Sequence, residues 1–329
     1  MPAIKTEGLS KRFGGFTAVN AIDLEVMEGE LFGFLGPNGA GKTTTISMLA
    51  TMLSVSSGNA FVNGFNVSEH PGAVRKSIGI VFQDPCLDID LTASENLEFH
   101  ARLYSVPENE IQGRVAKMLS LVELSDKADW LVKKFSSGMK RRLEIAKGLL
   151  HNPKVLFLDE PTLGLDPQTR RKLWEYIRAL NKREKTTVIL TTHYLGEADF
   201  LCDRIAVIDH GKIVALDTPE NLKKKLQGEI VRINSSENAK VSKLKIPGIL
   251  SASVFGNSIN FSVNDANTFL PMFFSAVAKE GISVHSVEIH RPSLEDVFIQ
   301  LTGHYMRDDE ASASEQAKAS LQQKGFVRR

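Results

Sequence analysis

Short apolar runs recur along the first two thirds of the chain. They fall at residues 31–35, 78–82, 155–158, 187–190 and 205–208. Runs that are this short, and apolar at nearly every position, are typical of parallel strands covered by helices on both faces of a sheet. The pattern therefore predicts an α/β core that extends from residue 3 to about residue 226.

Two stretches of this core depart from the parallel-strand pattern. At residues 21–26 apolar and polar side chains alternate up to a turn at 28–30, which predicts an antiparallel edge subdomain. Between residues 92 and 150 no strand pattern is found, and apolar side chains recur at helical spacing, as at Leu97, Ala101 and Tyr104. We predict that residues 92–150 form a helical insert in a mixed-sheet core.

A change of pattern near Pro219 marks a second domain. A helix that contains Lys223, Lys224 and Lys225 follows this proline, and its lysines indicate a solvated face, with contact to anionic lipid as the alternative. The elements expected beyond it are a strand at 229–234, a helix at 237–244, a hairpin of 249–255 and 258–263, a helix at 267–280 and a strand at 283–289. This βαββαβ order predicts a ferredoxin-like α+β domain over residues 227–305.

The end of the chain has a different character. Ser293 followed by Asp296 predicts a capping box at the start of a last helix. Residues 306–329 contain almost no apolar side chains, so we expect a disordered tail there.

The composition of the chain argues against some classes of function. Lys and Arg number 40 and Asp and Glu 39, so the net charge of +1 argues against a dedicated nucleic-acid binder. The sequence shows no run of about 18 apolar residues, and no secretory signal is visible, so we expect neither a membrane-spanning helix nor a leader. Cys86 and Cys202 have no metal-ligand spacing, which fits a reducing compartment. A cytoplasmic protein that reaches the membrane only through a partner is expected.

The first candidate site follows the strand at 31–35. This strand runs into Gly36-Pro37-Asn38-Gly39-Ala40-Gly41-Lys42-Thr43, and a helical pattern begins at Thr44. The order strand, GxxxxGK[ST], helix is that of a P-loop, in which glycines let the backbone wrap phosphate groups. Lys42 is expected to reach the β- and γ-phosphates and Thr43 to bind Mg²⁺. The core is therefore predicted to be a P-loop NTPase.

A pair of carboxylates follows another predicted strand. Asp159 and Glu160 come directly after residues 155–158, at the carboxyl end of the strand, where parallel sheets bind ligands. One carboxylate can hold the shell of Mg²⁺, and the other can orient or deprotonate the attacking water. We expect Asp159 in the first role and Glu160 in the second.

These motifs resemble those of ATP-binding cassette ATPases, the motor subunits of membrane transporters. The resemblance covers about residues 3–220 and includes Gln83 after 78–82, the D-loop at 163–166 and His193 after 187–192. It implies that Gly36 to Thr44 bind ATP and that Gln83 senses Mg²⁺ and the γ-phosphate. His193 is expected to bind the γ-phosphate and help to position Glu160, and Asp166 to form contacts across a dimer interface.

Two further positions are assigned by the same resemblance. Phe13 is expected to stack on adenine, with a core residue as the alternative. The family signature Leu-Ser-Gly-Gly-Gln is represented by Phe135-Ser136-Ser137-Gly138-Met139, which departs from it at Ser137 and Met139. In the family this element binds the ATP held by the opposite subunit. Two alternatives follow, an active homodimer or a heterodimer with a paralogous cassette.

The segment 292–303 resembles the ending of drug-resistance exporter ATPases of the daunorubicin-resistance type. Together the resemblances imply a subunit that hydrolyses ATP, dimerises around two ATP molecules and powers a separate membrane permease through its helical insert, in an exporter. It would lie on the cytoplasmic face of the membrane. The alternatives are a nucleotide-gated regulator of RNA or the ribosome, and a catalytically silent binding subunit.

Overall fold

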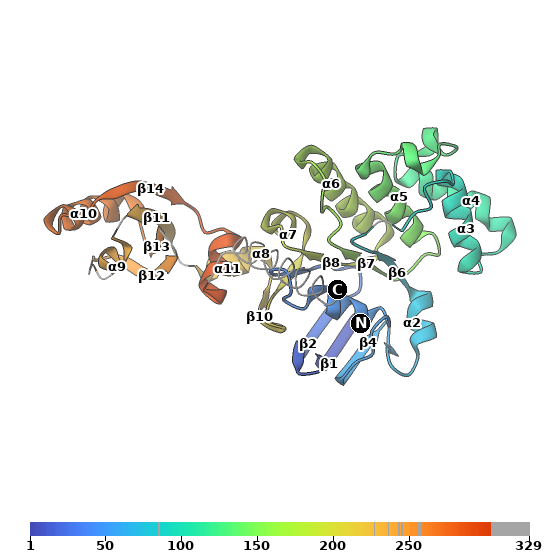
Figure 1. The fold of residues 1–329 in the computed structure, drawn as a ribbon, viewed down its shortest axis with the longest axis horizontal. Coiled ribbons are helices and arrows are strands. Elements are labelled where there is room, and N and C mark those ends of the chain that lie inside the picture. The colour runs from blue at the N-terminus through green and yellow to red at the C-terminus, as the bar shows by residue number, and fades with distance from the viewer. Residues whose placement is uncertain are drawn as a thin grey trace, which may run out of the picture. The chain divides into compact units, whose positions relative to one another are not determined.

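The chain folds into two compact units. The computed structural model describes residues 1–303, except for 85, 227, 236, 243, 245 and 256–257, so the predicted tail at 306–329 lies outside the described residues. The first unit ends at Ile213 and the second begins at Val214, within β10 (Lys212–Asp217) (Figure 1). No helix of the described part is both long and apolar enough to span a membrane.

A parallel sheet forms the centre of the first unit. Its parallel strands follow the order β9-β3-β8-β7-β6, with bounds Arg204–Asp209, Leu31–Leu35, Thr187–Thr192, Val155–Asp159 and Ile78–Val81. In β3, β7 and β8 every residue is buried, as the continuous apolar runs predicted. The helices of this core are α1 (Lys42–Leu49), α2 (Pro71–Ser77), α6 (Pro167–Glu184) and α7 (Leu195–Leu201).

The predicted antiparallel edge is confirmed and is larger than expected. It is a four-stranded sheet in the order β2-β1-β4-β5, with bounds Phe16–Met27, Pro2–Phe13, Ser57–Val62 and Phe65–Asn66. No strand was predicted at β1, because its pairing with β2 shifts register between Thr6 and Leu9, and such shifts break the alternation of apolar and polar positions. Gly8 lies within this irregularity at φ 59°.

The helical insert also matches the prediction. It contains α3 (Ala93–Leu103), α4 (Glu108–Leu121) and α5 (Ser137–Leu149), with two short 3₁₀ turns between α4 and α5. Thr92 starts α3 with a capping box, in which its hydroxyl accepts from the Glu95 N–H and the Glu95 carboxylate accepts from the Thr92 N–H. The three helices lie together in Figure 1.

The second unit has the ferredoxin-like topology. Its first helix is α8 (Pro219–Lys225), and its further elements are β11 (Glu229–Ser235), α9 (Asn238–Val241), β12 (Ile249–Phe255), β13 (Ser258–Val263), α10 (Ala266–Lys279), β14 (Val284–His290) and α11 (Leu294–Thr302). The sheet order β12-β13-β11-β14 is antiparallel at every pairing. The Ser293 capping box of α11 is present, whereas α9 is shorter than the helix expected at 237–244.

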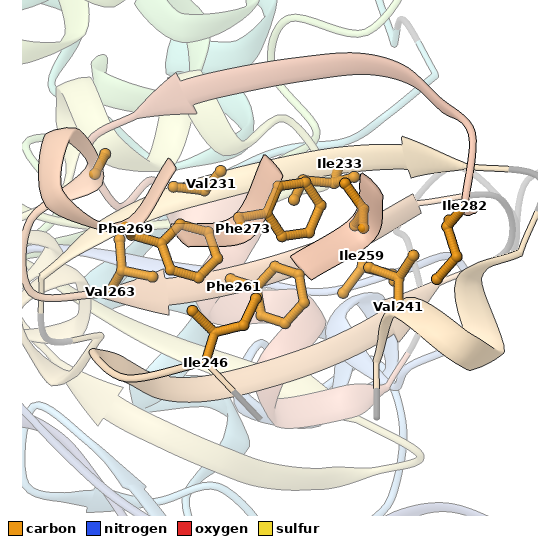
Figure 2. Packing of buried hydrophobic residues seen from close by; sticks show 12 residues of the cluster. Val231, Ile233, Val241, Ile246, Ile259, Phe261, Val263, Phe269, Phe273 and Ile282 are labelled. Carbon is orange, nitrogen blue, oxygen red and sulfur yellow. The ribbon is translucent and has the colours of Figure 1, made fainter. Parts of the chain in front are cut away.

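The core of the second unit is an aromatic cluster. Figure 2 shows Phe261 of β13 beside Phe269 and Phe273 of α10, and the centroids of these rings lie 5.6 to 6.1 Å apart. Val231 and Ile259 belong to the sheet side of the cluster and are fully buried. Such packing is the ordinary means by which a helix is held on one face of a sheet.

Candidate functional site

The P-loop lies between β3 and α1 in the first unit. A Cβ at Gly36 would overlap the carbonyl oxygen of Ile208, and one at Gly41 would lie 2.5 Å from the carbonyl oxygen of Ala18. Gly41 also has φ 104°, which side chains rarely tolerate, and it immediately precedes α1. The loop thus needs glycine at both positions to bring backbone N–H groups and the helix N-terminus to one place.

Lys42 is the first residue of α1 and is buried. Its Nζ donates to the carbonyl oxygens of Gly36 at 2.7 Å and Pro37 at 2.9 Å, and lies 3.8 Å from Glu160 Oε1. Burial lowers the pKa of Lys42, whereas the charges of Glu160 and Asp159 oppose this shift. The lysine is therefore held over the P-loop of its own chain, where it is expected to help the loop to bind phosphate.

Asp159 ends β7 and is bonded to two threonines. Thr43 Oγ1 donates to its Oδ1 at 3.0 Å, and the hydroxyl of Thr191, at the end of β8, donates to the same oxygen. The pairing of β7 with β8 places Asp159 opposite Thr191, so the sheet register itself creates this contact. A hydroxyl and a carboxylate side by side are oxygen ligands suited to Mg²⁺, which fills its remaining positions with phosphate and water.

Glu160 adopts φ 47°, which is uncommon for a residue with a side chain. Its N–H donates to the carbonyl oxygen of Thr191 at 3.2 Å and to the Thr191 hydroxyl at 3.0 Å, and its Oε1 lies 3.2 Å from His193 Nδ1. Burial alone would raise the pKa of Glu160, but the hydrogen bond and charge of His193, together with the charge of Lys42, lower it. The carboxylate is therefore ionised at neutral pH, as a general base must be.

Two of the predicted site residues, Gln83 and Phe13, have exposed side chains, unlike the buried Lys42, Asp159 and Glu160. Gln83 follows β6, and its carbonyl oxygen accepts from Arg141 Nη2 at 3.4 Å, while its side chain is exposed. Phe13 ends β1 with 47% of its surface exposed and with Lys11 Nζ 5.1 Å from the ring centroid. This exposure excludes the alternative of a core residue. The proposed contacts of both residues with nucleotide stay predictions.

The signature and the D-loop start two neighbouring helices. Ser136 caps α5 by accepting from the Met139 N–H at 3.2 Å, and the exposed Ser137 is its first helical residue. A Cβ at Gly138 would lie 2.5 Å from Thr169 Cγ2 of α6. Asp166 caps α6 by accepting from the N–H groups of Gln168 and Thr169, at 3.1 and 3.0 Å. Both segments therefore present helix N-termini, and their contacts with a second subunit stay predictions.

Sequence reasoning missed three buried residues that connect these segments: Thr191, Arg141 and Glu197. Glu197 of α7 accepts from Thr162 Oγ1 at 2.9 Å and from Trp174 Nε1 at 2.8 Å, and burial raises its pKa. Thr191 could have been noticed, since it is a polar residue at the end of an apolar strand and directly precedes the segment with His193. Arg141 had no such signal, because it lies between two other basic residues.

Comparison with known proteins finds family matches in both parts of the chain. The family described as "ABC transporter" matches residues 19–163, and the family "ATP-binding protein DrrA1-3-like, C-terminal domain" matches residues 218–302. Among solved structures, the ATP-binding cassette MJ0796, dimeric and bound to ADP and Pi, has 26% identity and a TM-score of 0.59, with 65% of this chain and 98% of that chain covered.

Curated relatives match over almost the whole chain. The daunorubicin resistance ATP-binding protein DrrA2 of Streptomyces coeruleorubidus is 40% identical and the linearmycin resistance ATP-binding protein LnrL of Bacillus subtilis 35% identical, with 94% and 93% of this chain covered. The alignments span 98% and 100% of those two proteins. Nod factor export ATP-binding protein I of Ralstonia nicotianae is 37% identical, over 93% of this chain and 96% of that protein. The chain belongs to the ATP-binding cassette family, as an ATP-hydrolysing subunit of a transporter.

Proposed function

We propose that the chain hydrolyses ATP with Lys42, Asp159, Glu160 and His193 as its central groups, and so powers a separate exporter permease. The observation that carries this proposal is their convergence. Lys42 Nζ lies 3.8 Å and His193 Nδ1 3.2 Å from one oxygen of Glu160, and Asp159 is the preceding residue. A cation, a base and a metal ligand within a few ångströms form the arrangement that phosphoryl transfer requires.

In this proposal ATP lies against the P-loop, at residues 36–44. The N–H groups of the loop and Lys42 bind its phosphates, and Phe13 stacks on adenine. Thr43, Asp159 and Gln83 would hold Mg²⁺, which neutralises charge on the β- and γ-phosphates when bound. The oxygen ligands already side by side at Thr43 and Asp159 support this assignment.

Glu160 is proposed as the residue that orients or deprotonates the attacking water. Its lowered pKa keeps it in the basic form, and the positions of Lys42 and His193 let both bind the γ-phosphate beside it. Catalysis then consists of positioning and charge stabilisation, with no covalent intermediate on the protein.

A second subunit is proposed to complete the site. Ser136, Ser137, Gly138 and Met139 at the N-terminus of α5 would bind the γ-phosphate held by the partner, and Asp166 would lie at the interface. Helix N-termini attract phosphate through their free N–H groups and dipole. Because only the triphosphate reaches both subunits, ATP closes the dimer and hydrolysis opens it.

We also propose that the helical insert contacts the permease, on the cytoplasmic face of the membrane. Phe99 and Leu103 on α3 are 60% and 63% exposed, and Ile89, in the segment before that helix, is 52% exposed. Exposed apolar side chains gathered on one element favour a protein contact. Names of relatives that refer to drug resistance and Nod factor export support an exporter. These names give no support to the two alternatives, which were a nucleotide-gated regulator of RNA or the ribosome and a catalytically silent binding subunit.

The domain division is part of the proposal. We propose a nucleotide-binding domain over 1–226 and an accessory ferredoxin-like domain over 227–305. The match of a C-terminal family to residues 218–302 supports two domains. The second compact unit begins at Val214 and includes α8, which packs with α11, so these observations favour a boundary before α8 instead of at residue 226. The accessory domain contains none of the proposed nucleotide ligands.

Steady-state hydrolysis by the purified chain tests the catalytic part of the proposal. Activity should require Mg²⁺, be lost in Lys42→Ala, and rise more steeply than linearly with protein concentration where monomer predominates. A chain that binds ATP without turnover would support the silent subunit instead.

Co-purification from membranes tests the partner. A protein with several membrane spans should accompany the chain and be lost with Phe99→Asp. Phe65→Asp is the matched control, since Phe65 is exposed on β5 of the antiparallel sheet. Equal loss with both variants would argue against the α3 surface.

A further inference from the structure

Arg141 of α5 is buried, and all five N–H donors of its guanidinium have acceptors. Nε donates to the carbonyl oxygen of Pro161 at 2.6 Å. The other acceptors are the carbonyl oxygens of Phe82, Gln83 and Glu160 and the carboxylate of Glu144, at distances from 2.5 to 3.4 Å. A fully satisfied buried guanidinium has one orientation, because every rotation breaks hydrogen bonds in a low-dielectric setting.

The backbone acceptors belong to two loops that are far apart in sequence. Phe82 and Gln83 follow β6, whereas Glu160 and Pro161 follow β7. Arg141 therefore connects the segment of the proposed γ-phosphate sensor with the backbone of the proposed base. Arg141 also connects both loops with α5 itself, which has the signature at its N-terminus.

Glu144, one turn further along α5, reinforces this connection. Its Oε2 accepts from Arg141 Nη1 at 3.0 Å, and its Oε1 accepts from the Cys86 N–H at 2.8 Å. Lys147, on the same face of the helix, donates to the Cys86 carbonyl oxygen at 2.6 Å. One face of α5 thus binds the loop containing Gln83 at its beginning and at Cys86.

We infer that Arg141 is a positioning residue for ATP hydrolysis: it holds the backbone of Glu160, the Gln83 loop and the signature helix in one arrangement. The inference rests on the proposed roles of Glu160 and Gln83. A shift of α5 moves the Glu160 carbonyl directly, so the helical insert and the base change position together. Arg141 has no hydrogen bond to the P-loop, which supplies most of the proposed phosphate contacts within the chain, so ATP affinity should change much less than turnover when Arg141 is replaced.

Turnover and ATP binding of Arg141→Gln and Arg141→Lys test the inference. Neither side chain reproduces the fork of five donors, so kcat should fall by more than about tenfold in both, with the Kd for ATP within about threefold of the original. Lysine keeps a charge beside Glu144 and should lose less turnover than glutamine.

The matched control is Arg142→Gln, on the next residue of α5. Arg142 donates to the Val122 carbonyl oxygen at 3.0 Å and lies 3.4 Å from Glu123, and both of these residues belong to the helical insert. Its loss should lower stability without lowering kcat by more than about threefold. An equal loss of kcat in the control would show that any damage to α5 slows turnover, and would overturn the inference.

The rate at which Cys86 is chemically labelled reports on the Gln83 loop and does not depend on ATPase activity. It is exposed, whereas Cys202 is buried, so a maleimide should label Cys86 first. Loosening of the Gln83 loop in Arg141→Gln should change the labelling rate of Cys86 by more than about threefold, and Arg142→Gln should leave it unchanged.

The outcomes separate the two proposals. An original chain without ATPase activity refutes the proposed function, whereas an active chain whose kcat survives Arg141→Lys and Arg141→Gln refutes only the positioning role. Failure of both variants to fold would assign Arg141 to folding and would likewise overturn it.

Discussion

The substitution Thr191→Val removes a single hydroxyl from the centre of the site. Thr191 is fully buried at the end of β8, and its hydroxyl donates to Asp159 Oδ1 and accepts from the Glu160 N–H at 3.0 Å. Valine has nearly the same shape, so the change removes hydrogen bonds without opening a cavity. Asp159 and Glu160 therefore each lose one hydrogen bond.

The expected magnitude follows from the contacts that survive. Asp159 Oδ1 keeps the Thr43 hydroxyl at 3.0 Å, and the Glu160 N–H keeps the Thr191 carbonyl oxygen at 3.2 Å. Neither group is left without a partner, so each lost bond costs about 1 kcal/mol, or about 2 kcal/mol together. For a unit of roughly 200 residues this lowers Tm by about 4 to 8 °C.

Asp159 also gains freedom to rotate away from Thr43. We therefore expect the Mg²⁺ concentration that gives half-maximal ATPase activity to rise by about tenfold, which corresponds to about 1.4 kcal/mol. Scanning calorimetry measures the first effect and a Mg²⁺ titration of the initial rate measures the second.

Thr187→Val is the matched control, at the other end of the same strand. The Thr187 hydroxyl accepts from the Gly29 N–H at 2.9 Å and is equally buried. This variant should lose about 1 kcal/mol of stability with an unchanged Mg²⁺ requirement. A Thr191→Val variant with a lowered Tm and an unchanged Mg²⁺ requirement would refute the expected role of the Thr191 hydroxyl at Asp159.

Three further predictions concern the proposed catalytic and signature residues. Glu160→Gln should keep ATP binding and lower kcat by at least about a hundredfold, so that a dimer accumulates with ATP; gel filtration that shows only monomer contradicts it. His193→Ala removes a hydrogen bond that lowers the pKa of Glu160, so this pKa rises and the acidic limb of residual kcat should move to higher pH; an unmoved limb refutes the coupling. Ser137→Gly should change the ATPase rate by less than about tenfold, and restored activity in an otherwise inactive protein would indicate an asymmetric pair.

The sequence allowed the core to be predicted because its signals are local. A strand buried on both faces leaves a continuous apolar run, as at β3 and β7, and the P-loop motif follows β3 directly in the sequence. The alternation that reveals an edge strand fails where the register shifts, and for this reason β1 was missed although β2 was found.

The supporting residues of the site could not be predicted in this way. In the run Lys140-Arg141-Arg142 three basic side chains look alike, yet only the middle one is buried. Its acceptors lie about 20 residues away at Glu160 and 59 residues away at Phe82, and no pattern within the helix encodes them. Such long-range polar contacts depend on how the sheet brings β6 and β7 beside α5.

The signature gives the clearest instance of structure explaining a departure from a family pattern. Gly138 is retained, and a Cβ there would lie 2.5 Å from Thr169 Cγ2 of α6, so a side chain at residue 138 would force Thr169 to move within one chain. Ser137 replaces the other glycine, is exposed, and is the first helical residue after the Ser136 cap, outside the region of positive φ. Any requirement for glycine at residue 137 must therefore come from the phosphate or the second subunit. A serine offers both its N–H and its hydroxyl to that phosphate, which is why a homodimer stays compatible with this sequence.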